Sequence, residues 1–141
     1  MPSNLKVLIV EDDVMIAEMT AELLGEHNFE VCGIATTGNE AMALAHSTNP
    51  DIALIDLRLA DNERGTKVAE RLASLGRIGI LYTTGNAARE ALEGAVGDGC
   101  LIKPYLHDDL LRALAIVAEI VEMGESNLKF PRQFRRLRSP G

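Results

Sequence analysis

The feature that most constrains the fold of this chain is an apolar run at residues 51–59, DIALIDLRL, which follows Asn49-Pro50. An apolar run of this length between turn residues indicates a strand buried on both faces, as in a parallel sheet. The run carries Asp56 near its far end, and a carboxylate inside an apolar segment costs free energy unless a partner compensates it. Ligands of open α/β sheets bind outside the carboxyl ends of the strands. Asp56 is therefore either a strand-end residue that caps a loop or a reactive carboxylate.

Strand-like and helix-like patterns alternate along the whole chain. Short runs rich in β-branched and other apolar residues predict strands, and apolar residues at helical spacing predict helices. Strands are expected at residues 5–10, 29–35, 51–59, 78–82 and 100–102, and helices at residues 14–26, 37–48, 67–75, 87–96 and 107–123. Five strands that alternate with five helices predict a parallel sheet covered by helices on both faces.

The composition limits the class of protein. A chain of 141 residues with 47% hydrophobic and 25% charged residues is typical of one soluble globular domain. No apolar stretch reaches the length of a membrane span and the N-terminus does not resemble a signal peptide, so a cytoplasmic protein without stable membrane association is expected. Cys32 and Cys100 have no CxxC spacing and the three histidines have no metal-ligand spacing. Reduced core thiols are expected, rather than a disulfide or a zinc site.

Charge divides the chain into an acidic body and a basic tail. Residues 124–141 carry five basic residues and one acidic residue, a balance of +4, which leaves −11 for residues 1–123 out of the total of −7. An acidic body repels nucleic-acid phosphates, so binding of DNA or RNA by the globular part is not expected. The predicted organisation is one domain over residues 1–123, followed by a basic C-terminal tail over residues 124–141 with no output domain.

Polar residues occupy the carboxyl ends of four predicted strands. They are Glu11, Asp12 and Asp13, then Asp56, then Thr83 and Thr84, and finally Lys103. Neighbouring parallel strands would bring Asp12 and Asp56 close together, and two such charges about 4 Å apart repel by roughly 4 kcal/mol at an effective dielectric constant near 20. A cluster of this kind needs a cation or a raised pKa, and an open set of carboxylates suits Mg²⁺. Carboxylate, metal, ammonium and hydroxyl together indicate phosphoryl transfer onto an aspartate.

Four segments carry a family resemblance: VLIVEDD at residues 7–13, LID at 54–56, YTTG at 82–85 and KPY at 103–105. In this order they resemble the receiver domain of bacterial two-component response regulators, of the single-domain, stand-alone type. The resemblance covers about residues 5–123. It implies a flavodoxin-like (βα)5 fold, a doubly wound five-stranded parallel sheet with strand order 2-1-3-4-5.

The resemblance also implies a function. The chain is expected to be a phosphoacceptor response regulator that accepts a phosphoryl group from a histidine kinase or a histidine phosphotransfer protein in a Mg²⁺-dependent reaction. It would then signal by protein–protein contact or act as a phosphate sink. It is not expected to be an enzyme, beyond slow self-dephosphorylation. The rival is a receiver-like adaptor that works without phosphorylation, and a Mg²⁺ phosphatase on the same scaffold is a third reading.

Roles carry over residue by residue from the resemblance. Asp56 is expected to accept the phosphoryl group and to share in binding the metal. Asp12 would bind Mg²⁺ directly and Glu11 would help through water, while the main-chain carbonyl of Arg58 would also reach the metal. Asp13 has two readings, as a further acid of the site or as the cap of the first helix, and we favour the cap.

Two further residues are expected to contact the phosphoryl group. Thr84 would be the switch hydroxyl and Lys103 the phosphoryl-binding ammonium, whereas Thr83 is read as structural. The chain departs from the family pattern at Ala60, where many receivers have proline, and at Cys100, where many have an aromatic residue. Coupled movement of a threonine and an aromatic residue therefore does not carry over to this chain.

The last predicted helix, residues 107–123, is apolar around more than one side. Its natural core stripe is Leu110, Leu114, Val117 and Val121, and a second stripe contains Ala113, Ile116, Ile120 and Met123. A surface helix needs one such stripe, so the second predicts a homodimer through this helix. The alternative is that the basic tail covers the second stripe.

The tail has an amphipathic pattern of its own. Phe130, Phe134 and Leu137 lie at positions i, i+4 and i+7, with Pro131 at a plausible first turn, which predicts a short basic helix. The segment is too short to be a stable helix alone. It is either a solvated terminus or docks in an apolar groove with acidic surroundings. That groove would belong to the last helix, beside Glu119 and Glu122, or to a partner protein. An anionic membrane surface is a weaker alternative.

Overall fold

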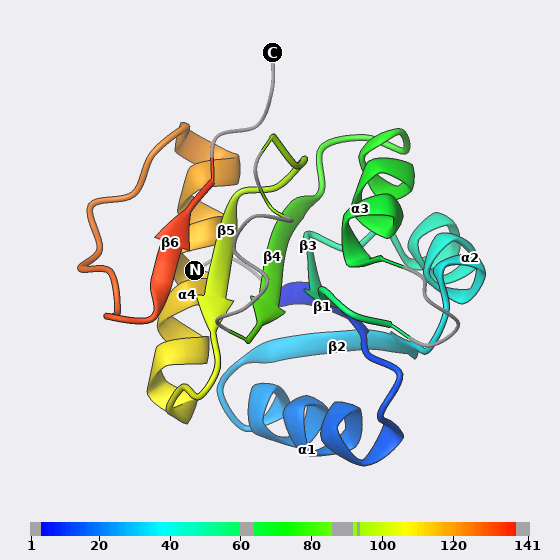
Figure 1. Cartoon of the computed structure of the whole chain (residues 1–141), viewed down its shortest axis with the longest axis horizontal. Helices are drawn as coiled ribbons and strands as arrows, with labels where there is room; N and C mark the ends of the chain where they lie inside the picture. Colours follow the sequence, from blue (N-terminus) through cyan, green and yellow to red (C-terminus); the bar gives the residue numbers. More distant parts are fainter. Residues whose placement is uncertain (1–3, 60–63, 86–91, 93, 138–141) are drawn as a thin grey trace.

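The computed structural model describes residues 4–59, 64–85, 92 and 94–137 of the chain. Its centre is a six-stranded sheet in the order β2-β1-β3-β4-β5-β6, with helices on both faces (Figure 1). The strands are β1 Leu5–Val10, β2 Phe29–Ala35, β3 Ile52–Asp56, β4 Gly79–Thr84, β5 Gly99–Ile102 and β6 Phe134–Arg136. The helices are α1 Val14–Gly25, α2 Gly38–Thr48, α3 Gly65–Ala73 and α4 His107–Met123.

The first five strands confirm the predicted parallel sheet and its strand order. The first four residues of β3 are buried and Asp56, its last residue, is partly buried. Val10 pairs with Ile55 and Asp56 pairs with Thr83, so the ends of β1, β3 and β4 lie level with one another. This register brings the residues that follow β1 to the same edge of the sheet as Asp56.

Two apolar cores lie on opposite faces of the sheet. One core packs α2 and α3 against the sheet and contains Ile55, Tyr82 and Cys100. The other packs α1 and α4 against the opposite face and contains Leu54, Leu81 and Leu101. Neighbouring residues of each strand enter different cores because side chains alternate across a strand. The helices that cover the two faces are visible in Figure 1.

The first helix begins where its cap predicts. The Asp13 carboxylate accepts hydrogen bonds from the N–H groups of Met15 and Ile16 at 3.1 and 3.2 Å. These are two of the backbone donors that a helix leaves without an intrahelical partner at its N-terminus. The capping role of Asp13 is confirmed. The helix predicted at residues 87–96, by contrast, falls mostly on residues outside the described part of the chain, and Ala60 lies outside it as well.

The C-terminal segment forms a strand, so the predicted tail helix is wrong. β6 pairs with β5 in the antiparallel sense, with Leu101 opposite Phe134 and Cys100 opposite Arg135. The Phe134 side chain is only 3% exposed. Its ring fills a space that β5 leaves at Gly99, where a Cβ atom would lie 2.6 Å from two ring carbons. The tail therefore docks on its own domain, as a sixth strand that extends the predicted five-stranded sheet.

The second apolar stripe of the last helix is not a free surface. Ile116 and Ile120 are buried, with 0% and 6% of their area exposed, and they share an apolar core with Phe134 and Leu128 of the tail. Only Met123 of that stripe is largely exposed among its larger side chains. Of the two alternatives for this stripe, cover by the tail is confirmed, and the sequence argument for a homodimer through residues 107–123 loses its basis.

A buried carboxylate links the tail to the start of β4. Asp98 accepts two hydrogen bonds from the Arg77 guanidinium, at 2.8 and 3.3 Å, and one from the N–H of Ile80 at 2.9 Å. Its own main-chain carbonyl accepts a hydrogen bond from the N–H of Leu137 at 3.0 Å. A buried charge is tolerated when it is paired and hydrogen-bonded in this way. Asp98 thereby holds β4, β5 and the end of the tail together.

None of the helices in the described part of the chain is both long and apolar enough to span a bilayer.

The tail strand generates a stability prediction. Phe134→Ala should lower the free energy of unfolding by about 3 kcal/mol, because it empties the space over Gly99. Phe130→Ala is the matched control. Phe130 is exposed, and its contact with Phe134 is an edge-on ring contact with centroids 4.9 Å apart, so about 1 kcal/mol is expected. Urea unfolding of both variants measures the difference, and equal losses would contradict the packing described here.

Candidate functional site

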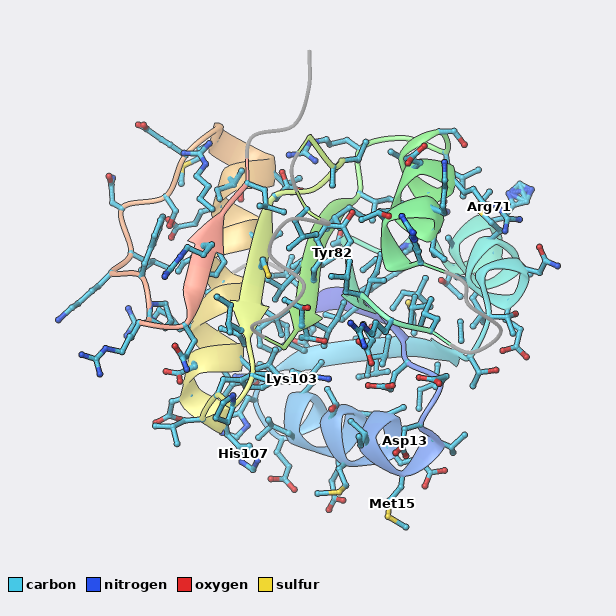
Figure 2. The ribbon with its side chains drawn as sticks, viewed as in Figure 1. Asp13, Met15, Arg71, Tyr82, Lys103 and His107 are labelled. Atoms are coloured by element: carbon cyan, nitrogen blue, oxygen red, sulfur yellow. The ribbon has the colours of Figure 1, made fainter. Side chains whose placement is uncertain are left out.

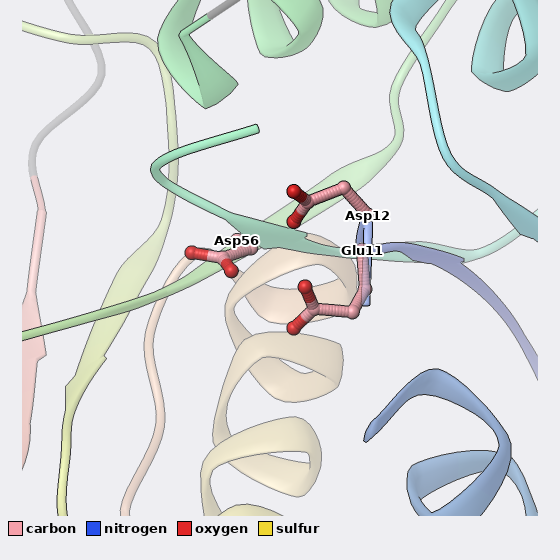
Figure 3. Close-up of side chains that lie close together, drawn as sticks. All are labelled: Glu11, Asp12 and Asp56. Carbon is pink, nitrogen blue, oxygen red and sulfur yellow. The ribbon is translucent and has the colours of Figure 1, made fainter. Parts of the chain in front are cut away.

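Three carboxylates meet at the carboxyl edge of the sheet. Glu11 and Asp12 follow β1, and Asp56 ends β3. One carboxylate oxygen from each lies within 4.8 Å of the others (Figure 3). Glu11 is buried, Asp56 is partly buried and Asp12 is exposed. The oxygen set of this cluster, with one member open to solvent, fits a hard cation such as Mg²⁺.

A single ammonium group faces the cluster within the part of the chain that the structure describes. The Nζ atom of Lys103 lies 3.8 Å from Oδ2 of Asp56. Lys103 follows β5, and its main-chain N–H donates to the carbonyl of Thr84 at 2.7 Å, which fixes the lysine backbone to the end of β4. Figure 2 shows Lys103 just below the ends of β4 and β5. At this distance the ammonium attracts Asp56 without a short hydrogen bond.

The two oxygens of Asp56 have different neighbours. Oδ1 accepts a hydrogen bond from the main-chain N–H of Arg58 at 3.2 Å, and Oδ2 faces Lys103. The Asp56 side chain is 15% exposed, so solvent reaches it. The Asp56 carboxylate is thus held at one oxygen by its own loop, while the other oxygen faces the lysine.

Glu11 has the most perturbed carboxyl of the cluster. Its pKa is raised to about 7, mainly by burial and in smaller part by the negative charge of Asp56 and by hydrogen bonding with Asp12 and Asp56. A hydrogen bond from the N–H of Asp13, at 3.1 Å, acts in the opposite direction. Burial disfavours the charged form and a nearby like charge disfavours it too. Close to neutral pH this carboxyl is therefore sensitive to any cation that enters the site.

The acidic cluster opens into a small recess between the sheet, α1 and the segment after β5. Its lining includes Ile16 and Thr20 from α1, Thr83 from β4 and Tyr105. The pKa of Tyr105 is raised, first by burial and then by the charges of Glu11 and Asp56. The Tyr105 hydroxyl therefore stays protonated at neutral pH and remains a hydrogen-bond donor.

The two threonines of β4 have different surroundings. Thr83 lies opposite Asp56 in the sheet and lines the recess. Thr84 is 3% exposed, and its hydroxyl donates to the carbonyl of Gly85 at 3.1 Å. Side chains alternate across a strand, so Thr83 lies on the same face of the sheet as Leu81, the face covered by α1 and α4. That alternation could have predicted from the sequence that Thr83 lines the recess beside α1.

The pKa of Glu11 generates a prediction for metal-free protein. Because its folded pKa of about 7 exceeds the ordinary value of 4.5, the folded state holds a proton that the unfolded state has released. The contribution of this proton to the free energy of unfolding is fully present below pH 4.5 and is lost as the pH rises through about 7. Glu11→Gln should remove a decline of roughly 2–3 kcal/mol over that interval, measured by urea unfolding in chelator. Glu18→Gln on the exposed side of α1 should keep the decline, and the same decline in Glu11→Gln would refute the assignment.

Sequence comparison places these features in a known family. The profile of the response regulator receiver domain matches residues 7–115. The chain is 32% identical over 114 residues to the transcriptional regulatory protein PdtaR of Mycobacterium tuberculosis, an alignment that covers 79% of this chain and 55% of that protein. It is 25% identical over 118 residues to the chemotaxis protein CheY of Listeria monocytogenes, which covers 82% of this chain and 99% of that protein. The chain thus spans about half the length of PdtaR.

Solved structures agree with this placement. The signal receiver domain of a modulated diguanylate cyclase from Desulfovibrio desulfuricans G20 superposes with a TM-score of 0.75 at 29% identity, over 87% of this chain and 100% of that one. A CheY-like receiver domain protein from Methanospirillum hungatei JF-1 gives a TM-score of 0.76 at 28% identity, over 86% and 99% of the two chains. The profile match, the relatives and the flavodoxin-like sheet agree: the chain belongs to the response regulator receiver domain family.

Proposed function

We propose that this chain is the phosphoacceptor of a two-component phosphorelay, and that Asp56 takes a phosphoryl group from a histidine kinase or a histidine phosphotransfer protein. The observation that carries the proposal is the position of the Lys103 ammonium, 3.8 Å from the carboxylate that closes β3. Glu11 and Asp12 contribute carboxylate oxygens within 4.8 Å of the same group. A nucleophile, a cation for phosphoryl oxygens and a metal-binding pair are thus collected at one edge of the sheet.

The proposed chemistry is a single displacement at phosphorus. An oxygen of the ionised Asp56 carboxylate forms the new O–P bond, while the P–N bond to the donor imidazole breaks and the imidazole nitrogen keeps the electron pair. The product is a mixed carboxylic–phosphoric anhydride on Asp56. Lys103 would attract the phosphoryl oxygens, and Thr84 would supply a hydroxyl once it leaves the carbonyl of Gly85.

Mg²⁺ belongs to the proposal because the carboxylates fit it. Asp12 and Asp56 would bind the ion directly, Glu11 through water, and the main-chain carbonyl of Arg58 would complete the protein ligands. When bound, the ion would neutralise part of the negative charge that a phosphoryl group brings to the cluster. The oxygen-only donor set and the exposure of Asp12 support this choice of metal.

The surface of α1 suits the protein that delivers the phosphoryl group. Val14, Met15, Ile16 and Met19 are exposed apolar residues on the first turns of this helix. Met15 projects outward from α1 in Figure 2, and Ile16 also lines the recess that holds Asp56. An apolar patch beside a reactive group favours a partner that presents its own reactive residue there. We infer that the phosphodonor binds over α1, in the cytoplasm, with no part taken by nucleic acid or membrane.

The downstream step is the open part of the proposal. The phosphorylated chain would signal by protein–protein contact or serve as a phosphate sink, and we assign it no enzymatic output. The rival function is a receiver-like adaptor that works without phosphorylation. The presence of all three carboxylates together with Lys103 favours the phosphoacceptor, because an adaptor has no need to hold them at one edge.

Phosphorylation of Asp56 is the first test of the proposal. Incubation with Mg²⁺ and acetyl phosphate should add one phosphoryl group to the wild-type chain, read by intact mass. Asp56→Asn should abolish the gain, because an amide is too weak a nucleophile to attack the phosphorus atom. Asp51→Asn, at the opposite end of β3, is the matched control and should keep it. A wild-type chain that gains no phosphate, or an Asp56→Asn variant that still does, would favour the adaptor.

Metal binding is tested separately by thermal unfolding. At a concentration one hundred times its Kd, Mg²⁺ should stabilise the fold by about 2.7 kcal/mol, seen as a rise in melting temperature. Asp12→Ala should remove most of that rise. Asp13→Ala should lose about 1 kcal/mol through the missing helix cap yet keep the rise with Mg²⁺. A full rise in Asp12→Ala would show that the metal lies elsewhere.

The patch on α1 is tested by comparing two phosphodonors. Met15→Glu with Met19→Glu should slow transfer from a histidine phosphodonor protein at least tenfold, since the pair buries apolar area in the complex. Phosphorylation by acetyl phosphate should not change, because the small donor needs no docking surface. Met123→Glu, with the same 63% exposure as Met19 but on α4, is the matched control. Equal slowing with both donors would place the effect in the site rather than in docking.

A further inference from the structure

One tail residue holds the backbone on both sides of Lys103. The main-chain carbonyl of Gln133 accepts a hydrogen bond from the N–H of Ile102 at 2.9 Å. Its side-chain amide donates to the carbonyl of Pro104, also at 2.9 Å. Ile102 and Pro104 are the two neighbours of Lys103 in sequence. Gln133 thus brackets the lysine from the outer side of β5.

The inner side of the same segment is held by β4. The N–H of Lys103 donates to the carbonyl of Thr84 at 2.7 Å. Between them, β4 and Gln133 fix the backbone from which the lysine side chain extends. The side chain itself is 40% exposed and has one contact with charge, at 3.8 Å from Asp56. The backbone therefore fixes the point from which the flexible side chain extends toward Asp56.

The tail presents Gln133 at one place because its neighbours are anchored. The ring of Phe134 fills the space over Gly99, and the N–H of Leu137 donates to the carbonyl of Asp98. Before Gln133 in the sequence, the carbonyl of Pro131 accepts a hydrogen bond from the N–H of Phe134 at 3.0 Å, which closes a turn around Gln133. A one-residue slip of β6 would move Phe134 off the glycine, so the register of the tail is fixed.

We propose that Gln133 is a positioning residue for Lys103, which makes the C-terminal tail part of the phosphoacceptor site. The inference rests on the proposed function for the role of Lys103, but the positioning itself does not depend on phosphate. The amide of Gln133 sets the Pro104 carbonyl, and with it the direction in which Lys103 leaves the backbone. Displacements of about 1 Å near a reacting group cost up to roughly a hundredfold in rate.

The coupling must run in both directions. If the docked tail favours the position of Lys103 beside a charged Asp56, then added charge on Asp56 favours the docked tail by the same factor. A protein that pulled the tail away would release the lysine, and phosphorylation would resist that removal. The tail would thus report on the state of the site without touching Asp56.

The test compares variants that differ in their ability to donate to the Pro104 carbonyl, with a control for the charge that one of them adds. Gln133→Met has a similar length and no donor, whereas Gln133→Lys restores a donor. Loss of one hydrogen bond should slow phosphorylation by acetyl phosphate about fivefold in Gln133→Met, with the donor concentration at half-maximal rate unchanged. Gln133→Lys should recover the wild-type rate. Asn127→Lys adds the same charge elsewhere on the tail and should have no effect.

A second readout needs no phosphodonor. Hydrogen exchange of the Lys103 amide should accelerate about fivefold in Gln133→Met and return to the wild-type rate in Gln133→Lys, while amides elsewhere in β4 and β5 keep their wild-type exchange rates. If the wild-type chain takes no phosphate, the proposed function fails, yet the exchange measurement still decides the positioning. Wild-type exchange at Lys103 in Gln133→Met would overturn the inference. Equal acceleration across β4 and β5, or no recovery in Gln133→Lys, would also overturn it, since either shows a merely structural role.

Discussion

Repulsion among three carboxylates is the constraint on which the functional edge of this molecule depends. Parallel strands point their carboxyl ends the same way, so Glu11, Asp12 and Asp56 meet at one edge of the sheet. Two charges about 4 Å apart repel by roughly 4 kcal/mol at an effective dielectric constant near 20. Lys103, at 3.8 Å from Asp56, offsets part of this repulsion, and the pKa of Glu11 is raised first by burial and in smaller part by the charge of Asp56. The packed cores on both faces of the sheet hold the cluster together against it.

β5 connects the lysine of this edge to the neighbouring strands. It leads into Lys103 at its carboxyl end and follows Asp98, whose carboxylate is bound to Arg77 and to the start of β4. On its outer side, β6 turns what would be an edge strand into an interior one. A strand held on both sides has little freedom to shift, and the position of the lysine is correspondingly fixed. The site is therefore built by strand pairing as much as by its own side chains.

The sequence predicts this edge well because its signals are local. The apolar run at residues 51–59 predicts a buried strand, which the structure ends earlier, at Asp56, and Asp13 before a helical pattern predicts a cap. The tail was misread because Phe130, Phe134 and Leu137 fit a helical period, whereas a three-residue strand has no period of its own. Its pairing partner lies more than thirty residues earlier in the chain. Gly99 leaves room for the Phe134 ring, but the local sequence around Gly99 does not show which residue fills that room.

The sixth strand also governs how the folded chain meets other copies of itself. Without it, the Gly99–Ile102 strand would offer an unpaired backbone edge with buried, apolar residues on both faces, the kind of edge that templates intermolecular sheets. β6 covers that edge with a strand of only three residues, two of which are the exposed Arg135 and Arg136. Short, positively charged edges pair poorly with further strands. The tail thus leaves the sheet with a short, charged outer edge in place of the longer apolar edge of β5.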